Sequence, residues 1–145
     1  MKIYLDTCTL QRPFDDQSQA RIKLESEAVL EIIQAIEKGK LELISSEVLE
    51  YELEMSQQPL RIEFGRKILE LATQTLILNE SHRKLANTFT DFGVKSIDAL
   101  HLAIAHEAKA IYLTTCDDRF ISASKRIPEL NCNLTSPTEF VINNL

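Results

Sequence analysis

Four acidic residues from separated parts of the chain have the types and positions expected of a divalent-cation site. Asp6 ends the strand-like run KIYLD, Asp98 opens a helical run, and Asp117 follows the strand-like run AIYLTTC. Glu52 lies in a further helical run, SSEVLEYELEM. Two like charges about 4 Å apart repel by roughly 4 kcal/mol at an effective dielectric constant near 20. Carboxylates gathered together therefore predict a bound Mg²⁺ or Mn²⁺, whose usual chemistry is on phosphate esters.

Two of the aspartates also have an ordinary structural explanation. Asp6 follows an apolar strand and could cap a helix or a turn. Asp98 comes two residues after Ser96, in the first turn of a helix, where a carboxylate interacts favourably with the helix dipole. Neither residue identifies a cation site by itself, and the prediction rests on their joint position with the other two acids.

The segment after the strand AIYLTTC contains further polar candidates. Thr115 lies two residues before Asp117, so both side chains point the same way if the strand continues that far. The Thr115 hydroxyl would then orient the carboxylate or a ligand water. We expect the neighbouring Asp118 to be the N-cap of a helix that starts at Arg119.

The acidic helix offers several glutamates, and their spacing separates them. Three of them follow i, i+3, i+7 spacing and predict one solvated stripe: Glu47, Glu50 and Glu54. Glu52 instead lies four residues after Val48 and three after Leu49, on the side that faces the core. We therefore choose Glu52 as the site residue, with Glu50 as the alternative.

The helix that carries Asp98 also contains a histidine. Its expected apolar stripe consists of Ile97, Leu100, Ile104 and Ala108, which leaves Asp98, His101 and Ala105 on another side. His101 lies about one turn from Asp98, and we expect it to pack or to support a ligand rather than to bind the cation itself.

The bulk properties are those of one globular domain spanning residues 1–145. The net charge of −6 argues against a broad basic surface for nucleic acid, but not against a nuclease, because carboxylates that hold a metal count as negative. No run is long enough to cross a membrane and the N-terminus does not resemble a signal peptide, so we expect a cytoplasmic protein. The three cysteines show no CxxC spacing, which predicts free thiols rather than disulfides or a zinc site.

Short strand-like runs alternate with longer helical runs, which is typical of an α/β domain with a mostly parallel sheet. The apolar run IYL predicts that the first strand is central. Strands are expected over residues 2–6, 41–44, around 76, 110–114 and around 133–134, and helices over 19–38, 46–56, 60–73, 82–91, from 96 onward, 118–126 and after Pro137.

Five segments, in this order, resemble the PIN-domain family of metal-dependent nucleases. The segments are KIYLDTCTL, SSEVLEYELE, SIDALHLAIA, YLTTCDDRF and SPTEFV. The resemblance implies a three-layer α/β/α sandwich with a central, mostly parallel sheet and a pocket for Mg²⁺ or Mn²⁺. It assigns the metal-binding and catalytic roles to Asp6, Glu52, Asp98 and Asp117, with Thr115 as an accessory polar residue. Cys8 departs from the family pattern, since many relatives carry Asn there.

The size of the chain is similar to that of the VapC-like ribonuclease toxins of toxin–antitoxin pairs. That resemblance implies hydrolysis of RNA, a homodimer and a small protein antitoxin. Basic residues that could hold flanking phosphates are Arg12, Lys95, Arg119 and Lys125. One alternative is a catalytically inactive PIN-like module that binds RNA or protein. Another is phosphotransfer chemistry of the haloacid-dehalogenase kind, but that motif requires a second Asp where this chain has Cys8.

Overall fold

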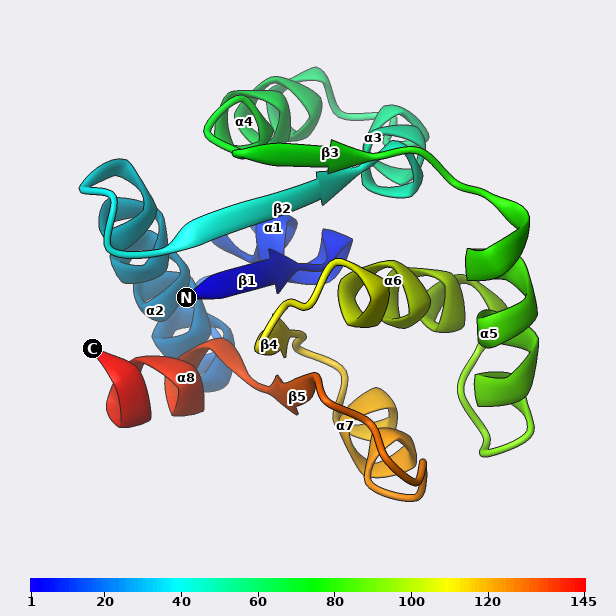
Figure 1. The fold of residues 1–145 in the computed structure, drawn as a ribbon. Coiled ribbons are helices and arrows are strands. Elements are labelled where there is room, and N and C mark those ends of the chain that lie inside the picture. Colours follow the sequence, from blue (N-terminus) through cyan, green and yellow to red (C-terminus); the bar gives the residue numbers. More distant parts are fainter.

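Five parallel strands form the central sheet of the computed structural model, which describes residues 1–145 (Figure 1). The strand order is β3–β2–β1–β4–β5. The strands are β1 (Lys2–Leu5), β2 (Glu42–Ser46), β3 (Gln74–Leu76), β4 (Tyr112–Thr114) and β5 (Asn133–Thr135). The parallel sheet and the central position of the first strand are both as the sequence predicts, because IYL is buried between two neighbouring strands.

Helices cover the sheet and complete the α/β/α fold. They are α1 (Thr7–Gln11), α2 (Ala20–Glu37), α3 (Glu47–Glu54), α4 (Pro59–Leu69), α5 (Glu80–Thr90), α6 (Ser96–Glu107), α7 (Asp118–Ser124) and α8 (Pro137–Asn144), with a 3₁₀ helix η1 (Arg12–Phe14). Helix α2 packs against α8, α3 against α4, and α5 against α6. The N- and C-termini lie on the same side of the molecule, away from α5 and α6 (Figure 1). None of the helices has the length and apolar character of a membrane span.

Helices α1 and η1 are not among the elements that the sequence predicts. These elements follow β1 directly, and α1 is only five residues long, too short to show a helical period. Asp6 is the N-cap of α1, and its side chain accepts a hydrogen bond from the Thr9 N–H. The structural explanation of Asp6 as a helix cap is therefore correct, and it does not exclude a second role.

The apolar stripe predicted for α6 is wrong in part. Ile97 is 36% exposed and Leu100 is only partly buried. The helix instead buries residues on several sides, including Ala99, Leu102 and Ala103. The reason is that α6 packs against α5 as well as contributing to the main core, so no single stripe describes its buried surface.

Candidate active site

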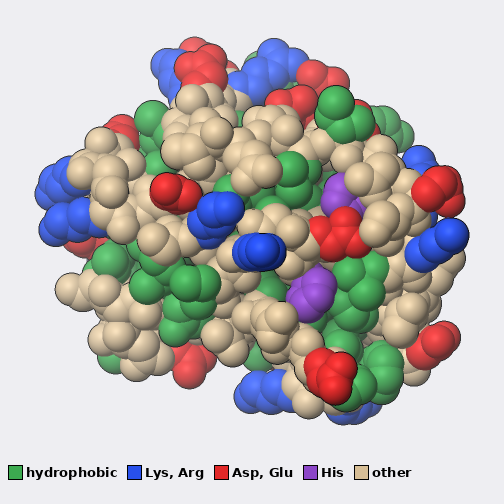
Figure 2. All heavy atoms as spheres, viewed as in Figure 1, with side chains coloured by type: hydrophobic (Ala, Val, Ile, Leu, Met, Phe, Trp, Pro, Cys, Tyr) green, Lys and Arg blue, Asp and Glu red, His purple; other side chains and the backbone are tan.

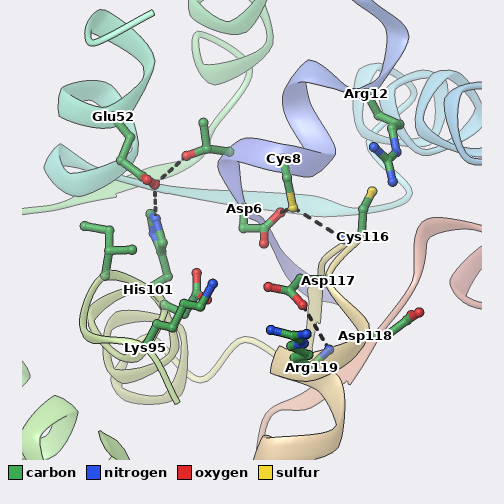
Figure 3. Close-up of a pocket in the computed structure, with 13 residues that line it drawn as sticks. Asp6, Cys8, Arg12, Glu52, Lys95, His101, Cys116, Asp117, Asp118 and Arg119 are labelled. Carbon is green, nitrogen blue, oxygen red and sulfur yellow. Dashed lines mark hydrogen bonds and ion pairs between the residues drawn. The ribbon is translucent and has the colours of Figure 1, made fainter. Parts of the chain in front are cut away.

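A polar pocket lies beyond the carboxyl ends of β1 and β4 (Figure 3). The sheet order reverses between these two strands, and in open parallel sheets such a reversal is the usual place for a ligand site. All four predicted carboxylates line it; the full lining is Asp6, Thr7, Cys8, Arg12, Glu52, Lys95, Ile97, Asp98, His101, Cys116, Asp117, Asp118 and Arg119. Four segments that are distant in sequence thus contribute acids to one space.

Asp6 is held rigidly at the end of β1. It is 4% exposed, and its backbone N–H donates to the Thr114 carbonyl at 3.2 Å. Its Oδ1 accepts hydrogen bonds from the Thr9 N–H and the Cys8 Sγ–H, both at 3.0 Å. Its Oδ2 makes no hydrogen bond with the protein, so one oxygen is fixed and the other is free.

Asp117 shows the same division between its two oxygens. Its Oδ1 accepts from the Arg119 N–H at 2.9 Å and the Phe120 N–H at 3.4 Å, which makes it the N-cap of α7. The prediction that Asp118 is this cap is therefore wrong. Asp118 instead forms an ion pair with Arg21 at 2.8 Å, and its side chain points away from the pocket centre (Figure 3). The geometric reason is that Asp118 is already the first residue of α7, so the cap falls one residue before the predicted one.

Glu52 extends from the last turn of α3 toward the pocket (Figure 3). Its Oε1 accepts from the Thr7 hydroxyl at 2.6 Å and is also bonded to His101 Nε2, while Oε2 has no protein partner. Burial raises the pKa of Glu52, but the hydrogen bonds from His101 and Thr7 outweigh it and leave the pKa below its usual value. Glu50, the alternative, is exposed and does not line this pocket.

Asp98 has no hydrogen bond or ion pair to any side chain of the protein. Burial and the negative charges of Asp6, Asp117 and Glu52 raise its pKa to about 6. Burial is the largest cause of this raised pKa, and repulsion among the carboxylates in a partly enclosed space adds to it.

Thr115 lies beneath the pocket rather than on its wall. Its side chain is fully buried, and its Oγ1 accepts from the Asp117 N–H at 3.2 Å and is 3.5 Å from Cys8 Sγ. It therefore supports the backbone of Asp117 and not the carboxylate. The neighbouring Cys116 thiol is the largest cause, and the Asp6 carboxylate a further one, of a pKa of the Cys8 thiol well above its usual range. All three cysteines are free, as predicted, and two of them are buried.

Three of the four predicted basic residues line the pocket, and Lys125 does not. Arg12 is anchored there by two hydrogen bonds to Glu25, at 2.8 and 3.0 Å, and by one to Asp15 at 3.0 Å. Lys95 and Arg119 form no ion pair with the protein, so their charges are available to a ligand. Lys and Arg side chains elsewhere are interspersed with Asp and Glu on the face in Figure 2 and do not form a continuous basic surface.

Sequence reasoning missed Thr7 and Tyr4, which hold Glu52 directly and through His101. Thr7 carries no signal in the sequence, because its contact with Glu52 spans 45 positions. Tyr4 carries a weak one, since a tyrosine in a central strand must find a partner for its hydroxyl. Nothing in the sequence identifies that partner.

The carboxylates form an open cluster. No three Asp, Glu, His or Cys side chains converge closely enough to form a ready-made set of ligands. The donor set nevertheless fits a hard cation, because Asp6, Glu52 and Asp117 each keep one oxygen without a protein donor and Asp98 keeps both. Mg²⁺ retains several waters when it is bound, so a few carboxylate oxygens suffice.

Comparisons with known proteins agree with this geometry. The model of the PIN domain family matches residues 3–126, a range that contains all four carboxylates. The fold is similar to a chain in the crystal structure of VapBC2 from Rickettsia felis bound to a DNA fragment from their promoter, with a TM-score of 0.59 and 16% identity. That match covers 94% of this chain and 98% of the other. A search of the curated proteins gave no match. Because the family model spans most of its length, the chain belongs to the PIN domain family.

Proposed function

We propose that the protein is an endoribonuclease that hydrolyses RNA phosphodiester bonds with Mg²⁺ or Mn²⁺ held by Asp6, Glu52, Asp98 and Asp117. Membership of the PIN domain family, whose members are generally nucleases, supports the reaction class. The main observation in favour of the site is that the two oxygens of a carboxylate have different contacts. Three of them have one oxygen held by protein donors and the other left for a ligand.

The charges of the pocket suit a phosphate-ester substrate once a cation is bound. Four carboxylates would repel such an anion, so a cation must offset them before a phosphate can approach. Bound there, the cation would lower the pKa of a water and neutralise charge on the phosphate. Lys95 and Arg119 lie at the same pocket without ion-pair partners, and they would donate to non-bridging or flanking phosphate oxygens.

The protein's own groups set the geometry of the reaction. The cap of α1 fixes Asp6, the cap of α7 fixes Asp117, and donors from two other elements fix Glu52. Ligands held this way need little reorganisation when the substrate binds, which favours catalysis. Asp98 is the least restrained of the four, and its free oxygens can adjust to the cation.

We further propose that the protein acts in the cytoplasm as the toxin of a toxin–antitoxin pair, as a homodimer controlled by a small protein antitoxin. The support is the fold similarity to a chain of VapBC2, which in that crystal structure is bound to promoter DNA. Sedimentation equilibrium tests the dimer, and a monomer at micromolar concentration would contradict it. Growth arrest on expression, relieved by a gene product encoded beside it, tests the toxin role.

The nuclease itself is tested on a panel of structured and single-stranded RNAs with EDTA, Mg²⁺ or Mn²⁺. We expect cleavage only with a cation, and its loss in Asp6→Asn and Glu52→Gln. Glu50→Gln is the matched control, because Glu50 lies on the same helix but is exposed outside the pocket. Cleavage that persists in the first two variants would reject the site. Absence of both cleavage and Mn²⁺ binding by calorimetry would favour the inactive binding module.

A further inference from the structure

A buried chain of hydrogen bonds runs from the N-cap of α3 to Glu52 on the same helix. The Ser46 hydroxyl caps α3 by accepting from the Leu49 N–H at 3.1 Å, and it lies 2.8 Å from the Tyr4 hydroxyl. The Tyr4 hydroxyl is 2.6 Å from His101 Nδ1, and His101 Nε2 is bonded to Glu52 Oε1. The chain therefore joins β2, β1, α6 and α3.

All of the intermediate side chains are removed from water. Ser46 and Tyr4 are fully buried, and His101 is 1% exposed. A buried donor that lacks an acceptor costs about 1–3 kcal/mol, so the direction of each hydrogen bond can be worked out from the requirement that every hydrogen be used.

The donor and acceptor of each hydrogen bond can be assigned by starting from the Glu52 carboxylate. Glu52 is ionised and only accepts, so His101 Nε2 carries a hydrogen. If Nδ1 accepts from the Tyr4 O–H, then Tyr4 accepts from Ser46 and every hydroxyl hydrogen has an acceptor. If Nδ1 also carried a hydrogen, the Tyr4 O–H would have to turn to Ser46, and the Ser46 O–H would have no acceptor. The first arrangement uses every hydrogen: His101 Nε2 donates to Glu52 Oε1, and His101 Nδ1 accepts from the Tyr4 hydroxyl.

The network also decides which oxygen of Glu52 is free. His101 and Thr7 approach the same atom, Oε1, from two different elements. Two donors on one oxygen fix the rotation of the carboxylate and leave Oε2 without a protein partner. A glutamate has three rotatable bonds, and Glu52 lies in the last turn of a helix of eight residues, so its orientation depends on these donors.

We propose that Tyr4 and His101 are positioning residues, which hold Glu52 in one orientation and present its second oxygen to the cation. This proposal rests on the proposed function for the role of Glu52, but the hydrogen-bonding pattern can be measured without any cation. Groups that orient metal ligands in this way typically change metal affinity by about 10–100-fold when they are removed.

The first test is nuclear magnetic resonance of the imidazole nitrogens in the cation-free protein. We expect His101 to show a hydrogen on Nε2 only, with Nδ1 as an acceptor. In Tyr4→Phe the ring should lose this single form, and the Glu52 carboxyl resonance should shift. Hydrogen on Nδ1 in the wild type, or unchanged Glu52 and His101 signals in Tyr4→Phe, would overturn the proposal whether or not the protein is a nuclease.

The second test is Mn²⁺ affinity measured by calorimetry. We expect Tyr4→Phe and His101→Leu to weaken binding about 10-fold or more, and His101→Gln to restore much of it, because its amide N–H can reach Glu52. Tyr51→Phe is the matched control, since Tyr51 is an exposed tyrosine of α3. Wild-type affinity in Tyr4→Phe, or no rescue by a folded His101→Gln, would contradict the positioning role. Absence of Mn²⁺ binding by the wild type would instead reject the proposed cation site.

Discussion

Replacing Asp98 by Asn should stabilise the cation-free protein at neutral pH, although it removes a residue of the proposed site. The pKa of Asp98 is raised from its usual 3.8 to about 6, first by burial and then by the neighbouring carboxylates. A difference of that size corresponds to about 3 kcal/mol between the two protonation states. Asp98 is only partly buried, and solvent screens such interactions, so we expect about 1–2 kcal/mol.

The sign depends on pH. Because the pKa of Asp98 is higher in the folded protein than in the unfolded chain, the folded state binds more protons between about pH 4 and pH 6. The favourable contribution of the protonated group is fully present below the unfolded pKa and is lost as the pH rises through about 6. Asp98→Asn should therefore match the wild type near pH 4 and exceed its stability at pH 7.

The assay is urea denaturation in EDTA at both pH values, with Glu50→Gln as an exposed carboxylate control. Equal stability of Asp98→Asn and the wild type at pH 7 would refute the argument that burial and carboxylate repulsion disfavour the ionised form of Asp98. Added Mn²⁺ should reverse the order, since a ligand at about 100 times its Kd stabilises the folded protein by roughly 2.7 kcal/mol. A wild type that gains no stability from Mn²⁺ would contradict an assembled cation site.

Two further substitutions test the packing and the rim of the pocket. Gly65→Ala should destabilise the protein by about 1–3 kcal/mol, because the new Cβ would lie 2.5 Å from Leu53 Cδ1 at the contact between α4 and α3. An unchanged melting temperature would contradict this prediction and show that Leu53 can move aside. Arg119→Ala should weaken RNA binding and reduce its salt dependence by about one phosphate contact. Arg66→Ala, which breaks an exposed ion pair with Glu54, is the control and should have neither effect. Equal effects of the two substitutions would contradict a role for the pocket rim.

Periodicity along the chain was enough to predict the sheet and the positions of two of the carboxylates that line the pocket. The run IYL is buried on both faces, which requires a central strand, and Asp6 follows it directly. Asp117 follows a second strand of the same parallel sheet, so both acids must emerge at the same edge. Spacing on α3 likewise distinguished Glu52 from Glu50, because the two residues lie on different sides of the same helix and only Glu52 is on the side next to the core.

Helix packing limited the same reasoning on α6 and α7. The apolar period of a helix reflects burial against one neighbouring surface. Helix α6 packs against more than one, so the predicted stripe that includes Ile97 is wrong in part. A shift of one residue in the start of α7 exchanged the roles of Asp117 and Asp118. Such a shift depends on which of the two carboxylates can reach the free N–H groups of the first turn. A cap at Asp117 and a cap at Asp118 are equally compatible with the amino-acid sequence.

The sequence by itself determined which residue types could bind a cation and which end of the sheet they would occupy, since strand direction and strand sequence are local properties. Only the tertiary structure decided how those carboxylates are held. The contacts of Glu52 with Thr7 and His101, and of His101 with Tyr4, join positions that are 45 to 97 residues apart. Hydrogen bonds of that kind depend on atomic distances across packed elements, and no pattern of spacing along a single chain encodes them.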